Sequence, residues 1–164
     1  MKRTMCALLA VLMLVGCFML PACKKTEEQE VLREKYLREI QEGYDAEMAK
    51  EENQTTLAMT QLTEQYAHAW KTAAEDCYES IMTFDGKLSA NESFDSIKAL
   101  RDYVKTEKET FDEDYQTQCD AYLKSLQATH GDGTIVGLSM AVFQYGLQKD
   151  WALTLADLHD THCK

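Results

Sequence analysis

Residues 57–84 read LAMTQLTEQYAHAWKTAAEDCYESIMTF, and this stretch decides the fold. Apolar side chains recur in it every three or four residues, the spacing that places them along one face of an α-helix. The face consists of Met59, Leu62, Tyr66, Trp70, Ala73, Cys77, Ile81 and Phe84, and the same spacing reaches Leu88. Because the pattern continues over about eight helical turns, it predicts a long helix with a wide buried stripe.

Two later segments show the same period. The first carries Ile97, Leu100, Val104, Phe111, Tyr115, Cys119, Tyr122 and Leu126. The second carries Leu138, Val142, Tyr145, Leu147, Trp151, Leu155 and Leu158. Each segment therefore predicts a further long helix with an apolar face.

The predicted helices are separated by two breaks, at residues 85–92 and 130–134. Asp85-Gly86 ends the first pattern, and Ser89 with Glu92 offers a capping box for the next helix, with Asn91 and Ser93 as rival caps. The second break contains Gly131 and Gly133, both able to adopt a positive φ, and either Asp132 or Thr134 could cap the last helix. Short connections of this kind favour antiparallel neighbours.

Composition excludes most other fold classes. The chain has 164 residues, 45% of them hydrophobic, with 7 glycines and a single proline, Pro21. A β-sandwich or barrel would need turn residues every 8–12 residues or so, which this chain lacks. We therefore expect one all-α domain, an antiparallel bundle of three to four helices, whose main part covers residues 55–164.

Residues 24–54 are dominated by Glu, Lys, Gln and Arg. A narrow apolar stripe crosses them, formed by Val31, Leu32, Tyr36, Leu37, Ile40, Tyr44 and Met48. This pattern predicts a polar helix. It fits equally a stalk outside the domain and the first helix of the bundle.

The first 23 residues resemble an export signal. Met1-Lys2-Arg3 is basic, residues 4–20 are apolar without a charge, and the chain turns polar at Lys24. A transmembrane anchor is the alternative, but a span needs about 20 apolar residues and Pro21 interrupts this run. We therefore expect residues 1–23 to be a signal peptide.

Two cysteines stand where the apolar run ends. Leu14-Val15-Gly16-Cys17 and Leu20-Pro21-Ala22-Cys23 both resemble the bacterial lipobox, whose cysteine receives a diacylglyceryl group. Cys17 fits the pattern better because proline is unusual in it, and Cys23 is the alternative. Either site implies cleavage before the cysteine and a lipid anchor in the cell envelope, on the outer side of the cytoplasmic membrane or in the periplasm. Ordinary secretion is the competing interpretation.

The net charge of the chain restricts the classes of molecule that it can bind. The chain holds 28 acidic residues against 17 Lys and Arg, a net charge of −11. Loss of Lys2 and Arg3 with the leader leaves 15 basic residues against 28 acids, a net charge of −13. Such a surface repels nucleic acid and anionic headgroups and attracts cationic proteins by long-range steering. We therefore expect no nucleic-acid partner, although acidity also serves solubility alone.

Catalytic motifs are absent from the sequence. It contains no Gly-x-Ser-x-Gly elbow, P-loop or dinucleotide-binding fingerprint. His159-Asp160-Thr161-His162-Cys163 resembles a metal site, since two His at i and i+3 share a helix face, but it lies at the chain end, where helices fray. We therefore predict no enzyme, no catalytic residue, no metal and no cofactor.

From residue 55 to 158 the order of features resembles the lysozyme inhibitor LprI-like family of exported bacterial proteins. Met59 and Tyr78 stand where the family has its Met and Tyr, Phe111 precedes Cys119 by the family's eight residues, and Gly131-Asp132-Gly133-Thr134 is similar to its glycine break. The sequence departs from the family at Leu62, which replaces a cysteine, and at Tyr115-Gln116, which replaces an Arg-Asp pair. The resemblance implies inhibition of lysozyme.

The thiols of the domain are Cys77, Cys119 and Cys163. If the helices reverse near residues 90 and 132, a rise of about 1.5 Å per residue places Cys77 and Cys163 level with residues 103 and 101. Outside the cytoplasm such a pair oxidises. The geometry predicts a Cys77–Cys163 disulfide and a reduced, buried Cys119.

Two functions fit these observations. The first is a lipid-anchored helical binding protein that inhibits lysozyme or another cationic cell-wall-degrading enzyme. The second is a structural or adaptor lipoprotein of the cell envelope without inhibitory activity.

Overall fold

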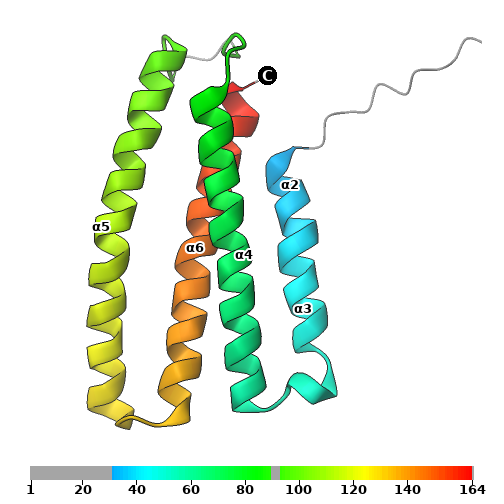
Figure 1. Ribbon diagram of the computed structural model, residues 1–164, viewed down its shortest axis with the longest axis vertical. Helices are drawn as coiled ribbons and strands as arrows, with labels where there is room; N and C mark the ends of the chain where they lie inside the picture. Colours follow the sequence, from blue (N-terminus) through cyan, green and yellow to red (C-terminus); the bar gives the residue numbers. More distant parts are fainter. Residues whose placement is uncertain (1–30, 90–92, 164) are drawn as a thin grey trace, which may run out of the picture. The chain divides into compact units, whose positions relative to one another are not determined.

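The computed structural model describes residues 31–89 and 93–163. Three long helices dominate them: α4 (Thr56–Thr83), α5 (Ile97–His130) and α6 (Thr134–His162) (Figure 1). Before them come α2 (Leu32–Tyr36), a π-helical turn η1 (Leu37–Gln41) and α3 (Glu42–Met48), which follow one another directly, and then a 3₁₀ turn η2 (Glu51–Asn53). We call α2, η1 and α3 together the N-terminal helix.

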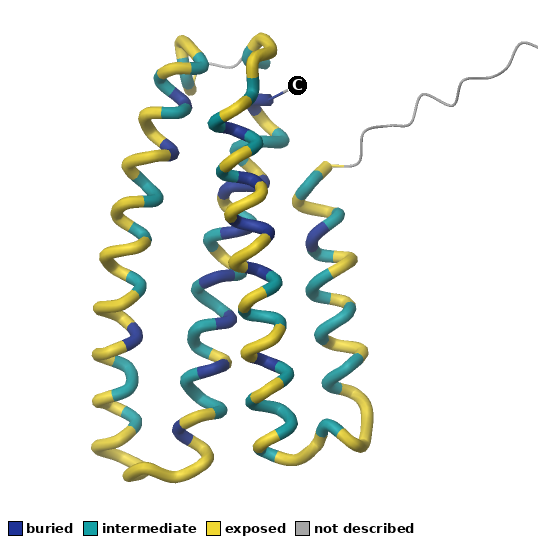
Figure 2. Tube along the Cα trace, viewed as in Figure 1, coloured by how far each residue is buried: buried dark blue, intermediate teal, exposed yellow. Residues whose placement is uncertain are grey.

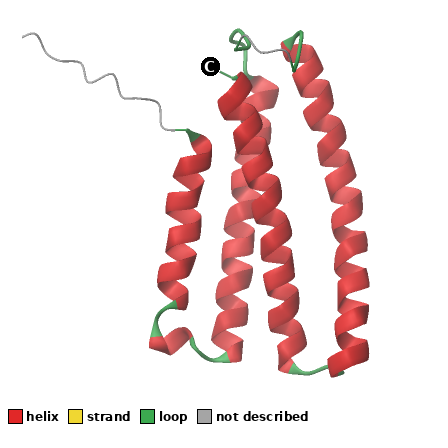
Figure 3. Ribbon diagram, turned by 180° about the vertical axis from the view of Figure 1, so that it is seen from behind, coloured by secondary structure: helices red, strands yellow, loops and turns green. Residues whose placement is uncertain are grey.

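The predicted all-α antiparallel bundle is confirmed. Successive helices reverse direction, and the described residues hold no strand, only an isolated bridge between Leu88 and Cys163 (Figure 3). As a consequence of the reversals α4 and α6 run in the same direction, and these two parallel helices make the most extensive contact of the bundle.

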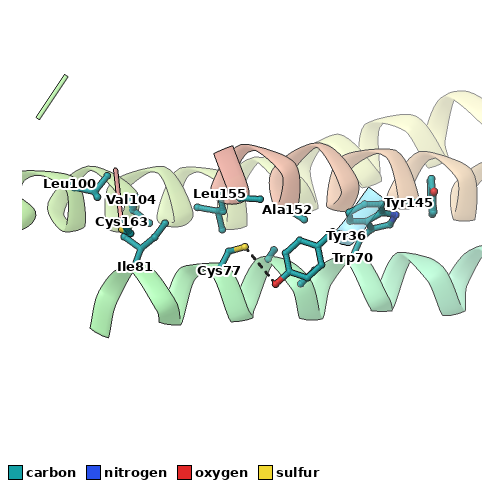
Figure 4. Close-up of a cluster of buried hydrophobic side chains, with 13 residues drawn as sticks. Tyr36, Trp70, Cys77, Ile81, Leu100, Val104, Tyr145, Ala152, Leu155 and Cys163 are labelled. Carbon is teal, nitrogen blue, oxygen red and sulfur yellow. Dashed lines mark hydrogen bonds between the residues drawn. The ribbon is translucent and has the colours of Figure 1, made fainter. Parts of the chain in front are cut away.

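The core lies mainly between α4 and α6. Small residues allow these two helices to approach closely, because Ala73 and Ala74 of α4 and Ala152 and Ala156 of α6 are all buried. Larger side chains fill the space above and below them: Trp70, Cys77, Ile81, Tyr145 and Leu155 (Figure 4). The predicted stripe of residues 57–84 therefore faces α6 for most of its length.

The N-terminal helix belongs to the bundle. Its side chains Leu32, Leu37, Ile40 and Tyr44 pack against the core, and Tyr36 is buried within it. Gly43 lets this helix come close to α4, since a Cβ at that position would lie 3.1 Å from the Tyr66 hydroxyl oxygen. Of the two interpretations that the sequence left open, the stalk and the first helix of the bundle, residues 32–48 adopt the second.

Helix α5 is covered on one side only. Its buried residues are Leu100, Val104 and Cys119, and its contacts are made chiefly with α6 and sparsely with α4. Most of its surface is exposed (Figure 2). This thin cover leaves clefts along both flanks of α5.

The cap of α5 differs from the predicted one. Ser96 caps the helix by accepting a hydrogen bond from the Ala99 backbone N–H, whereas Ser89 donates its own N–H to the His162 carbonyl at 3.0 Å. Ser89 thus bonds to the end of α6 and does not cap α5. Glu92, the other residue of the predicted capping box, lies outside the described residues. The connection between α4 and α5 is therefore longer than expected.

The second turn also differs in part. Gly131 ends α5 with a φ of 65°, as its predicted freedom allows. Gly133, rather than Asp132 or Thr134, is the N-cap residue of α6 and makes no side-chain cap bond. The Asp132 carboxylate instead accepts a hydrogen bond from the Gln127 side-chain amide at 3.0 Å.

Residues 31–164 form one compact unit with a hydrophobic core of its own. A unit of this kind is able to fold by itself. None of the helices in the described ranges combines the length and the apolarity that crossing a bilayer requires.

Candidate functional site

The predicted lipid-attachment residues, Cys17 and its alternative Cys23, lie outside the described residues. The remaining predicted site residues, Cys77 and Cys163, are described, and so are the histidines near the chain end.

The predicted Cys77–Cys163 disulfide is not formed in the structure, where Cys77, Cys119 and Cys163 are all buried free thiols. Cys163 lies beside Ile81, one helical turn beyond Cys77 (Figure 4). One turn is an axial offset of about 5.4 Å, which adds to the sideways separation of the two helices, so a bridge would need backbone movement.

The level of Arg101 explains the difference. Its Nη2 donates to the Phe84 carbonyl at 2.5 Å, so residue 101 is level with the end of α4 and not with Cys77. The predicted register places Cys77 level with residue 103, whereas Arg101 reaches the carbonyl groups of Ile81 and Phe84 at the end of α4. Cys163 does stand near Arg101, as expected.

Cys77 has a different partner. Its Sγ lies 3.8 Å from the Tyr36 hydroxyl oxygen, in a buried hydrogen bond that joins α4 to the N-terminal helix. Burial raises the pKa of the Cys77 thiol to about 11, and burial also raises the pKa of Cys163. Both thiols are thus protonated and unreactive near neutral pH.

The two histidines near the chain end, His159 and His162, have different neighbours. The His162 ring packs edge-on against Phe94, with centroids 4.9 Å apart, and burial lowers its pKa. His159 Nδ1 lies 3.4 Å from an Asp160 carboxylate oxygen. In residues 31–89 and 93–163 no three His, Cys, Asp or Glu side chains gather as a metal site would need.

Asp160 has a structural task that the sequence did not reveal. Its two carboxylate oxygens accept hydrogen bonds of 3.0 Å from the backbone N–H groups of Leu32 and Arg33. These are free donors at the start of α2, so Asp160 caps that helix from α6. Arg33 Nε adds an ion pair of 3.1 Å with Asp157. We call this set of contacts the Asp160 clasp.

A second polar contact holds the N-terminal helix farther along. The Gln41 side-chain oxygen accepts hydrogen bonds from the Tyr145 hydroxyl at 2.7 Å and from Lys149 Nζ at 2.6 Å. Tyr145 also stacks on Tyr44, with centroids 4.7 Å apart. Gln41 closes the π-helical turn, an irregularity often found where a helix is adjusted to a specific contact.

One cleft opens between α4, α5 and α6, and its volume is about 50 Å³. Its walls are the stacked rings of Phe111 and Trp151, 4.9 Å apart, and the ring of Tyr78. Its charges balance: Lys108 pairs with Asp112, and Lys71 lies 3.9 Å from Glu75. A small cleft with neutralised charges offers little attraction to a charged ligand.

A larger groove lies between α5 and α6, and we call it the α5–α6 groove. Its volume is about 380 Å³. Its lining residues are Tyr122, Val142, Phe143, Gly146, Leu147 and Asp150. Its two aromatic lining residues, Tyr122 and Phe143, stack with ring centroids 4.3 Å apart. Neither this groove nor the smaller cleft is lined by a histidine or a cysteine.

The acidic residues cover the outside of the bundle. Helix α5 shows this most clearly, with exposed carboxylates at Asp102, Glu109, Asp112, Glu113, Asp114 and Asp120. The ion pairs along α5 join residues four apart on that helix, such as Lys98 with Asp102. These local pairs leave the acid excess of the chain facing solvent.

Sequence reasoning missed the α5–α6 groove, although a signal was available. Residues 135–148 contain no charged side chain and are mostly apolar, so this part of α6 has no strongly polar face. A helix of that kind is normally covered all round. Here Ile135 and Val142 remain 48% and 50% exposed.

No family model matches the chain, and no match was found among the curated proteins or the solved structures.

Proposed function

We propose that this protein is an exported, lipid-anchored binding protein of the cell envelope, and that its acidic helical bundle inhibits lysozyme or another cationic wall-degrading enzyme. The observation that carries the proposal is charge. The chain has 28 acidic residues against 17 basic ones, and exposed carboxylates line the outer face of α5. A surface of this sign speeds encounter with a basic protein and disfavours nucleic acid and anionic lipid.

Two further observations support a binding role. The order of features over residues 55–158 resembles the LprI-like family, whose name implies lysozyme inhibition. The α5–α6 groove offers an apolar surface with one carboxylate, Asp150, and neither cleft is lined by a His or a Cys. Binding is therefore the simpler use of this surface.

The anchor is tested separately from the binding. Metabolic labelling with palmitate should mark the full-length protein through the Leu14-Val15-Gly16-Cys17 box. Labelling that survives Cys17→Ser and disappears with Cys23→Ser moves the site to Cys23. Labelling that survives both changes together contradicts the lipid anchor.

The binding is tested with the lipid-free chain from Lys24 onward. Added in excess to lysozyme and a suspension of cell walls, it should slow the fall in turbidity, and its binding to lysozyme should weaken as salt is raised. Unchanged lysis together with no binding at low salt would contradict the proposal. Binding without inhibition would favour the adaptor lipoprotein, the second function considered from the sequence.

A further inference from the structure

The α5–α6 groove is an apolar surface that the bundle itself leaves open. Val142 lines it and is 50% exposed, and Ile135 lies two helical turns earlier on the same side of α6. Gly146 follows Val142 one turn later. Exposed apolar side chains that are contiguous with a groove mark an interaction surface more often than isolated ones do.

Gly146 faces open space within the part of the chain that the structure describes. A Cβ at this position would meet no atom within 4 Å. Glycine inside a helix costs about 1 kcal/mol relative to alanine. A glycine in the lining of an open apolar groove does, however, allow another backbone to approach closely.

Charge decides between the occupants that could cover this groove. A second copy of the chain would bring the same large negative charge to the interface, and an anionic membrane surface would be repelled as well. Asp150 is the charged member of the groove lining, and its side chain is exposed. Lys149, the neighbouring cation, donates to Gln41 instead.

We propose that the α5–α6 groove docks a basic amphipathic helix of a cationic protein partner. The apolar face of that helix covers Val142, Phe143 and Leu147, and its Lys or Arg side chains pair with Asp150. Helix-in-groove recognition of this type needs an apolar trough with charged edges. The inference rests on the proposed function for the cationic nature of the partner, and it adds the place and mode of binding.

The test uses residues 24–164 and two probes, lysozyme and a labelled synthetic peptide of Leu and Lys with helical amphipathic spacing. Val142→Gln and Gly146→Gln place polar bulk in the groove without changing the charge. Each change should lower the affinity for both probes about tenfold, the loss expected when an apolar contact of about 1.4 kcal/mol is removed. Asp150→Asn should weaken both probes less, and mainly at low salt.

Matched controls separate the groove from the general surface. Leu57→Gln removes an apolar side chain that is 67% exposed at the start of α4, and Glu64→Gln removes an exposed acid of α4. Neither should change binding by more than about twofold. Gly146→Gln should also raise the melting temperature, because a glycine leaves the helix interior, so its loss of binding cannot come from unfolding.

The outcomes distinguish the two proposals. If the peptide binds in a way that depends on Val142 but lysozyme does not bind, the groove is a docking site and lysozyme is not the partner. If lysozyme binds in a salt-sensitive way and its affinity is unchanged by Val142→Gln and Gly146→Gln, the proposed function stands and the groove is not the binding site. A concentration-dependent dimer that Val142→Gln abolishes overturns the basic helix as the occupant in favour of a second copy.

Discussion

Trp70 is the largest side chain of the core, and it is fully buried between α4 and α6. Within the described ranges its indole Nε1 is the buried side-chain atom that lacks a hydrogen-bond partner. The residue therefore stabilises the bundle chiefly by packing.

Truncation of Trp70 should be costly. We expect Trp70→Ala to lower the free energy of unfolding by about 3–5 kcal/mol, because it leaves a large cavity. Trp70→Phe keeps most of the ring contacts, so it should lower the free energy of unfolding by a clearly smaller amount. Urea denaturation followed by circular dichroism measures both, and equal costs for the two variants would contradict the packing argument.

His162 gives the bundle a dependence on pH. Burial lowers its pKa in the folded protein below the ordinary value of about 6.5. As the pH falls through 6.5 the unfolded chain therefore binds a proton that the folded chain does not, and stability decreases. Thermal melts at several pH values between about 7.5 and 5.5 should show this fall, and the fall should be shallower in His162→Gln.

The control for this prediction is His68, an exposed histidine of α4. His68→Gln should leave the pH dependence of the melting temperature unchanged. If His68→Gln and His162→Gln flatten the curve equally, the buried ring is not its source.

The three thiols should all react once the chain is unfolded. Alkylation in denaturant without reductant should label Cys77, Cys119 and Cys163, because the structure pairs none of them. In the native protein at pH 8 the labelling of Cys77 should be slow, since its pKa is raised to about 11 and few thiolates form. Peptide mapping that finds a mixed Cys77–Cys163 peptide would restore the disulfide expected from the sequence.

At the scale of the elements, the 3.6-residue stripes predicted the helices well. Period alone placed α4, α5 and α6, because each has an apolar face that repeats over many turns. Caps were predicted less well, since Ser89, Ser93 and Ser96 are locally equivalent candidates. Ser96 caps α5 while Ser89 bonds to His162, a contact between residues far apart in the sequence.

The attachment of the N-terminal helix also depends on distant residues. Asp160 lies in α6, more than a hundred residues from the start of α2 that it caps. No local sequence pattern could therefore predict the Asp160 clasp. Gln41, Tyr145 and Lys149 are joined in the same way across the bundle. These contacts distinguish a packed helix from a stalk, which the sequence could not do.

The Asp160 clasp should control the stability of the N-terminal helix. Asp160→Ala removes both acceptors of the Leu32 and Arg33 N–H groups, and loss of a cap of this kind costs about 0.5–2 kcal/mol. Hydrogen exchange in residues 32–48 should accelerate more than exchange in α4. Asp150→Ala, an exposed acid of the same helix, serves as the control and should leave both rates unchanged.

At the scale of the whole molecule, the charge of the binding surface was predictable and its shape was not. Composition alone supplies the acid excess, and the structure only distributes it over the exposed faces. The α5–α6 groove arises because α5 covers one side of a helix without a strongly polar face and leaves Val142 and Gly146 open. That depends on how far apart the helix axes lie, a quantity that periodicity does not encode.

The acid excess also sets how the bundle responds to salt, through two opposing effects. Salt screens the exposed ion pairs, and each such pair contributes at most about 0.5 kcal/mol. The pairs concerned are local to one helix, such as Lys71–Glu75, Lys98–Asp102 and Lys105–Glu109. Salt also screens the mutual repulsion of a chain with a net charge of −11, which acts between all helices at once.

We expect the second effect to dominate, because the screening length falls from about 30 Å at 0.01 M salt to about 8 Å at 0.15 M, below the distance between the outer faces of the helices. The melting temperature should therefore rise over this range, equally in sodium chloride and in choline chloride. Removing two acids of the exposed run on α5, with Glu113→Gln and Asp114→Asn, should raise the melting temperature at low salt and reduce its rise. A melting temperature that falls as salt is added would mean that the ion pairs outweigh the repulsion, and it would contradict this prediction.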